Sequence, residues 1–157
     1  MAPTAQEITK LLEADIAHQL SAVKKSSLEG GLIQVGTLAS YFREDVDFNI
    51  NGQGFALATH VKGSEAIEVA STKSSLPPLA ELLDNSKPIE GKVLQVIGGG
   101  PDSEWAAAVL KSTATTVKGK PFNHEWVITI KFDDNGKIAS IKTYADTLQL
   151  QNIIDGN

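Results

Sequence analysis

The feature that most constrains the fold is a run of alternating residues between positions 126 and 132. Large apolar residues occupy every second position, and smaller or polar residues lie between them. Period-two alternation rich in β-branched and aromatic residues predicts a strand with one buried face. The Asn135-Gly136 pair that follows is a strong hairpin signal because both residue types tolerate a positive φ. Residues 137–145 are therefore predicted to return as the antiparallel partner strand.

The N-terminal part of the chain predicts helices. Thr4 and Glu7 form a capping-box pattern, and apolar residues then recur at helical spacing as far as Val23. The same spacing predicts a second, shorter helix over residues 32–42. A third helix is expected to begin at Ser64, a good N-cap, and it cannot continue intact through the Pro77-Pro78 pair.

Alternating segments predict three more strands, over residues 46–50, 89–97 and 104–117. Helices segregated from a meander of antiparallel strands define an α+β domain. Long strands must twist, and a twisted sheet wrapped over helices encloses a cavity. We therefore expect a cone-shaped, curved antiparallel sheet wrapped over three N-terminal helices, with a central apolar pocket, in a single domain over residues 1–157.

Composition narrows the classes of function. The net charge is −5 and no basic cluster occurs, so nucleic acid is not an expected partner. The chain has no cysteine, and its three histidines are too scattered for a metal site. No apolar stretch approaches the roughly 18 residues of a membrane helix. These observations predict a cytoplasmic protein without a metal site or membrane contact.

Three segments together resemble the nuclear transport factor 2-like (NTF2-like) superfamily, and within it the SnoaL-like polyketide cyclase branch. They are the run Tyr-Phe-Arg-Glu-Asp-Val-Asp-Phe at residues 41–48, the helix start at 61–67 and the closing hairpin at 123–146. The resemblance implies a pocket for a small hydrophobic substrate between the concave sheet face and the first three helices. It also implies cofactor-free acid–base chemistry and a homodimer formed through the outer sheet face. The same fold hosts many reactions and also simple binding.

His124 is the main candidate for acid–base chemistry. Strand parity places its imidazole on the face of Trp126 and Ile128, where a histidine can exchange a proton near neutral pH. The alternative is a core histidine that is hydrogen-bonded to a neighbour. A bulge would turn Glu125 inward instead, so Glu125 is a reserve candidate.

Two further titratable residues are candidates. His60 is expected in a loop at the pocket mouth, where it would pair with His124 or simply be solvated. Asp146 is a carboxylate near the pocket, but an N-cap backed by Gln149 is the stronger interpretation. Thr143 occupies the position of an acid in relatives of the epoxide hydrolase and phenazine-pathway groups, which argues against those two mechanisms.

The remaining candidates would bind substrate, although each also has a plain packing or surface interpretation. They are Tyr41, Arg43, Phe48, Trp105, Lys111, Trp126, Ile128, Ile141 and Thr143. The predicted function is a cofactor-free acid–base enzyme acting on an apolar small metabolite, as an isomerase, cyclase or dehydratase of a natural-product pathway. The alternative is a non-catalytic small-molecule-binding or dimeric interaction domain.

Overall fold

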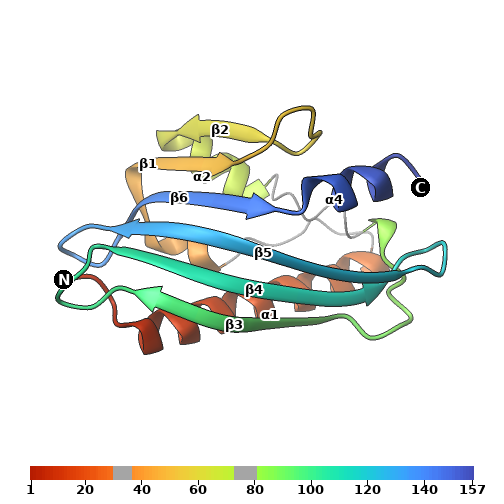
Figure 1. Cartoon of the computed structure of the whole chain (residues 1–157), viewed down its shortest axis with the longest axis horizontal. Helices are drawn as coiled ribbons and strands as arrows, with labels where there is room; N and C mark the ends of the chain where they lie inside the picture. The colour runs from red at the N-terminus through yellow and green to blue at the C-terminus, as the bar shows by residue number, and fades with distance from the viewer. Residues whose placement is uncertain (30–36, 73–80) are drawn as a thin grey trace.

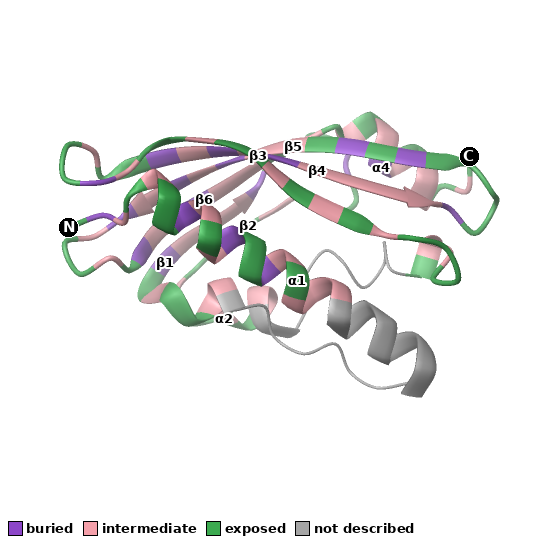
Figure 2. Ribbon diagram, turned by 90° about the horizontal axis from the view of Figure 1, so that it is seen from below, coloured by how far each residue is buried: buried purple, intermediate pink, exposed green. Residues whose placement is uncertain are grey.

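The computed structural model describes residues 1–29, 37–72 and 81–157 (Figure 1). It has an α+β architecture with a curved sheet of six strands in the order β2-β1-β6-β5-β4-β3. Helices α1 and α2 lie on the same face of this sheet (Figure 2). The elements are α1 (Ala5–Glu29), the 3₁₀ helix η1 (Thr37–Tyr41), β1 (Phe42–Ile50), β2 (Thr59–Lys62), α2 (Gly63–Thr72), β3 (Glu90–Gly98), β4 (Trp105–Thr115), β5 (Pro121–Phe132), β6 (Ile138–Ala145) and α4 (Thr147–Ile154).

The capping signals at the N-terminus are confirmed, but the expected second helix is not. Thr4 N donates to Glu7 Oε2 at 2.8 Å, and Glu7 N donates to Thr4 Oγ1 at 3.3 Å. Residues 32–36 and the Pro77-Pro78 break lie outside the described residues. The described part of the expected second helix forms only the short η1, and Phe42, the last residue of the expected helix, already belongs to β1. The alternating apolar residues Val46, Phe48 and Ile50 favour an extended chain here, and the strand begins earlier than helical spacing suggested.

The sheet is mixed, so the prediction of a wholly antiparallel sheet is wrong. β1 pairs in parallel with β6, while the other neighbouring pairs are antiparallel. Strands β3 to β6 follow each other through short turns, which force antiparallel pairing. The early β1–β2 hairpin joins the free edge of β6 through a long connection, which leaves either direction open.

The closing hairpin forms as predicted, although its turn differs from the expected one. Gly136 has a φ of 75°, and no described residue other than glycine has a positive φ, so Asn135 does not adopt the left-handed conformation. Asp133 Oδ1 accepts hydrogen bonds from Asn135 N and Lys137 N, at 2.9 Å each. The Asp133 side chain thus holds the turn, which then needs only one left-handed residue.

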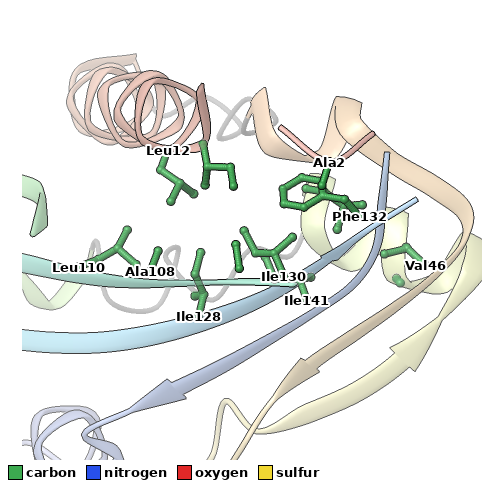
Figure 3. Packing of buried hydrophobic residues seen from close by; sticks show 13 residues of the cluster. Ala2, Leu12, Val46, Ala108, Leu110, Ile128, Ile130, Phe132 and Ile141 are labelled. Atoms are coloured by element: carbon green, nitrogen blue, oxygen red, sulfur yellow. The ribbon is translucent and has the colours of Figure 1, made fainter. Parts of the chain in front are cut away.

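The main core lies between α1 and the inner face of the sheet. Figure 3 shows Leu12 of α1 pointing toward Leu110 and Ile128 of the sheet. Ile8 of α1 and Ile130 of β5 are fully buried in the same cluster, and burial of such a side chain stabilises the fold by about 1.5–3 kcal/mol. Within the described residues, no helix is both long and apolar enough to cross a membrane.

A second, smaller core forms where α4 meets the sheet. Leu150 of α4 is buried together with Ile50, Phe55 and Phe122. Phe122 belongs to β5, which also contributes Ile128 and Ile130 to the main core, so β5 carries residues of both clusters on one face. The residue between them on that face is His124.

Candidate functional site

The inner face of β5 carries His124, as the strand parity predicts. The register of β5 with β4 runs without interruption from Pro121 to Lys131, so no bulge separates His124 from Trp126. His124 is 6% exposed, whereas Glu125 is an exposed residue of the opposite face. Glu125 therefore cannot replace His124 on the inner face.

Two aromatic rings enclose the imidazole of His124. The Phe122 ring lies 5.6 Å away with an interplanar angle of 16°, and the Trp126 ring lies 5.5 Å away at 19°. Stacked arrangements of this kind fix the plane of the ring and exclude water from its faces. The edge of the ring, which carries both nitrogens, is the part left for polar contacts.

Gln149 of α4 fixes the tautomer of His124. His124 Nδ1 lies 2.8 Å from Gln149 Oε1, and Gln149 Nε2 donates to the carbonyl oxygen of Asn123 at 2.8 Å. Because a carbonyl only accepts, the Asn123 contact requires the amide nitrogen of Gln149 on that side and its oxygen toward the imidazole. The hydrogen-bond network therefore assigns the proton of neutral His124 to Nδ1 and leaves the lone pair on Nε2.

His124 Nε2 has no hydrogen-bond partner among the described residues. In the described part of the chain, the one fully buried side-chain nitrogen or oxygen without a partner is His18 Nε2. His124 Nε2 therefore keeps some contact with solvent. A nitrogen with a lone pair, no internal partner and solvent contact can accept a proton or a hydrogen bond from a ligand.

Burial lowers the pKa of His124 below its ordinary value of 6.5, while the hydrogen bond that His124 donates to Gln149 and the negative charge of Asp146 act in the opposite direction. The cost of placing a charge in an apolar environment is the larger effect. His124 is thus neutral near pH 7, and its Nε2 is ready to act as a base.

Ser112 is a neighbour of His124 that the sequence analysis missed. It lies directly opposite His124 in the β4–β5 register, so the two residues share the inner face, with Cβ atoms roughly 4.5–5.5 Å apart. Thr143 is also on the inner face but lies opposite Ile128, four residues along β5 from His124, which corresponds to roughly 13 Å. Of these two hydroxyl groups, that of Ser112 is therefore the nearer to the imidazole.

A buried carboxylate on α1, Asp15, was also missed. Asp15 is 6% exposed, and its oxygens accept hydrogen bonds from Leu38 N at 2.9 Å and from Gln19 Nε2 at 2.6 Å. Its position seven residues after Ile8 places it on the apolar face of the helix, and this spacing could have revealed it. The contact with Leu38 N ties α1 to η1, which is a structural role.

The structure corrects the placement of His60. It lies in β2, which pairs with β1 where a loop was expected, and its Nε2 is 2.7 Å from Asp47 Oδ1. Lys62 Nζ is 3.4 Å from the other oxygen of Asp47. These side chains lie on the outer face, so the expected pair between His60 and His124 does not form. A strand of four residues is too short for alternation to separate it from a loop.

Two expected pocket residues on β4 also lie on the outer face. The Trp105 residue is 46% exposed, with Lys131 Nζ 5.6 Å from the centre of its ring, so its expected place in the core or pocket wall is wrong. Lys111 Nζ lies 3.9 Å from Glu125 Oε1 on the outer surface and not at a pocket rim. Alternate residues of β4 are apolar on both faces, so the pattern alone does not tell which face is buried.

The other candidates divide between the surface and the inner face. Arg43 makes a two-point contact with the Asp45 carboxylate, at 2.7 and 2.5 Å, and Tyr41 is 41% exposed. Asp146 is the N-cap of α4 and accepts from Gln149 N at 3.0 Å. The expected substrate-binding residues on the inner face are Phe48, Trp126, Ile128, Ile141 and Thr143. Among the described residues, no group of three or more histidine, aspartate or glutamate side chains could hold a metal ion.

Solved structures share this fold over nearly the whole chain. A candidate isomerase from Bacillus subtilis is 16% identical, with 99% of this chain and 98% of that protein covered and a TM-score of 0.59. An NTF2-like protein from Burkholderia xenovorans is 21% identical, with 96% and 98% covered and a TM-score of 0.55. A candidate isomerase from Rhodopseudomonas palustris is 16% identical, with 91% and 97% covered and a TM-score of 0.54. No family model and no curated protein matches the sequence. The chain thus has the NTF2-like fold.

Proposed function

We propose that this chain is a cofactor-free acid–base enzyme of SnoaL-like type, acting in the cytoplasm on an apolar small metabolite of a natural-product pathway. The reaction would be an isomerisation, cyclisation or dehydration in an apolar pocket at the inner sheet face beside His124. The observation that supports it is the buried imidazole of His124, neutral near pH 7, with Nδ1 held by Gln149 and Nε2 unpartnered. Two solved structures with this fold belong to candidate isomerases.

In the proposed reaction, His124 Nε2 removes a proton from a carbon next to a carbonyl group of the substrate. The electron pair of the broken C–H bond moves into an enolate, and the imidazolium then returns the proton to another carbon or to an oxygen. The hydrogen bond from Nδ1 to Gln149 Oε1 strengthens when the ring becomes charged. The Ser112 hydroxyl, opposite His124 in the register, would donate to the enolate oxygen.

Deuterium exchange into an apolar ketone tests this function without knowledge of the natural substrate. In D₂O, the wild-type protein should accelerate exchange at the carbons next to the carbonyl group of 2-tetralone, followed by NMR. His124→Gln should reduce the acceleration by about 10²-fold or more. His60→Gln is the matched control on the outer face and should exchange at the wild-type rate. No acceleration by the wild-type protein, or an unchanged rate for His124→Gln, would contradict the proposal.

A non-catalytic small-molecule-binding domain is the second candidate. The observation that favours this candidate concerns Asp15, the one buried carboxylate among the described residues. Both of its oxygens already accept hydrogen bonds, from Leu38 N and from Gln19 Nε2. In that case His124 would have no acidic partner, and a bound ligand would be recovered unchanged after long incubation.

For either function we propose a homodimer that forms through the outer sheet face. Ile97 is 57% exposed and Trp105 is 46% exposed on this face. Analytical ultracentrifugation tests this proposal by measuring the mass of the particle in solution.

A further inference from the structure

The inner sheet face and its outer counterpart differ sharply in polar groups. On the four strands from β3 to β6, the polar side-chain groups of the described inner face are the hydroxyls of Ser112 and Thr143, the imidazole of His124 and the indole N–H of Trp126. The lysines of the same strands lie outside, and no described lysine or arginine is buried. A buried anion without a paired cation is strongly disfavoured. The inner face therefore suits an uncharged ligand.

The hydrogen-bonding character of His124 follows from Gln149. The amide of Gln149 is held from both ends, by the carbonyl oxygen of Asn123 and by His124 Nδ1, each at 2.8 Å. The backbone N–H of Gln149 donates to Asp146 Oδ1 at 3.0 Å, which caps the helix that carries this side chain. Neutral His124 consequently offers only an acceptor at Nε2. The adjacent Ser112 hydroxyl can donate or accept as required.

We propose that His124 Nε2 and the Ser112 hydroxyl form a site that selects uncharged apolar ligands carrying a hydrogen-bond donor, such as a phenolic or enolic hydroxyl, and that Gln149 is the positioning residue that sets this preference. The proposal deepens the proposed function, because it assigns a substrate class to the same site. An ether of the same shape brings an acceptor against the lone pair of Nε2. A carboxylate of similar size brings a charge with no buried cation to meet it.

Three small bicyclic probes separate these ligand classes. They are 2-naphthol, which donates a hydrogen bond, 2-methoxynaphthalene, which only accepts, and 2-naphthoate, which is an anion. Calorimetric titration of the wild-type protein at pH 7.5 should show 2-naphthol binding about five-fold tighter than the ether, as expected for one neutral hydrogen bond, and the naphthoate weakest. His124→Phe, which keeps a stacked ring, should abolish the difference between the naphthol and the ether.

Gln149→Glu tests the positioning role. A carboxylate beside Nδ1 favours the charged imidazolium, whose Nε2–H is a donor. The oxygen of the naphthol and that of the ether can both accept from it, so the preference for the naphthol should disappear. Gln151→Glu, two residues further along the same helix, is the matched control and should keep the wild-type preference. Equal affinity for the naphthol and the ether in the wild-type protein, tightest binding of the naphthoate, or an undiminished naphthol preference in Gln149→Glu would overturn the proposal.

Nitrogen-15 NMR of His124 measures the tautomer directly, also if Gln149→Glu folds poorly. At pH 8 the wild-type spectrum should show the proton on Nδ1 and an unprotonated Nε2, and Gln149→Leu should lose this bias. A proton on Nε2 in the wild-type protein would overturn the proposal. Neither measurement involves turnover, so failure of the selectivity proposal is distinguishable from failure of the proposed enzyme activity. A protein that prefers the naphthol but does not accelerate ketone exchange would refute only the enzyme activity. A protein that accelerates ketone exchange but does not prefer the naphthol would refute only the selectivity.

Discussion

The contact between α4 and β5 predicts an unequal cost for two neighbouring glutamines. Gln149→Ala removes the acceptor of the buried His124 Nδ1–H, and leaving a buried donor unsatisfied costs about 1–3 kcal/mol. The carbonyl of Asn123 is on an exposed residue, so water replaces that hydrogen bond at little cost. Alanine recovers about 0.4 kcal/mol of helix propensity. The expected net loss in the free energy of unfolding is about 0.6–2.6 kcal/mol.

Gln151→Ala is the matched control in the same helix. Gln151 Oε1 accepts from the backbone of Ala56 at 2.8 Å, and Ala56 is exposed, so the expected loss is within about 0.5 kcal/mol. Urea denaturation of both variants at pH 8, where His124 is neutral, gives the two values. Equal losses, or a loss for Gln149→Ala below about 0.5 kcal/mol, would refute the reasoning that the amide holds the imidazole.

Three further predictions concern His124 and the packing beneath it. Because burial lowers the pKa of His124 in the folded state, the unfolded chain binds more protons below about pH 6.5. The free energy of unfolding of the wild-type protein should therefore decrease as the pH is lowered below about 6.5, and that of His124→Phe should decrease less. Asp146→Ala should cost about 1 kcal/mol as a lost N-cap, and NMR titration should show a still lower pKa for His124 because a nearby negative charge is removed. Gly91→Ala should cost about 1–3 kcal/mol by thermal unfolding, since the added Cβ would lie 2.5 Å from Ile16 Cγ2, and Ile16→Ala in the same chain should relieve part of it.

Strands with one apolar and one polar face could be predicted from the sequence because their alternation is local. The run that contains Trp126 and Ile128 gave both the strand and the inward direction of His124. Helix ends with a side-chain cap were equally accessible, since Thr4 and Asp146 contact residues three positions along the chain. These features depend on neighbours in sequence, which a pattern records.

Features that depend on distant segments could not be predicted in the same way. Nothing in the sequence of β1 specifies that it pairs in parallel with β6. The outer position of Trp105 follows from its place opposite Lys131 on β5, because β4 itself is apolar on both faces. Ser112 became a site residue only through the register that sets it opposite His124. Register and topology therefore determine the site, and periodicity alone does not contain them.

Gln149 shows why the chemistry of a site can escape a correct local prediction. The spacing from Asp146 to Gln149 is a capping-box pattern, in which the second side chain would return to the backbone of the cap. Only half of that pattern forms, since the Gln149 backbone contacts Asp146 while its amide reaches β5. The same side chain thus docks α4 on the sheet and orients the imidazole of His124. Substitutions that loosen this helix should therefore alter the tautomer of His124 even when they lie far from its ring.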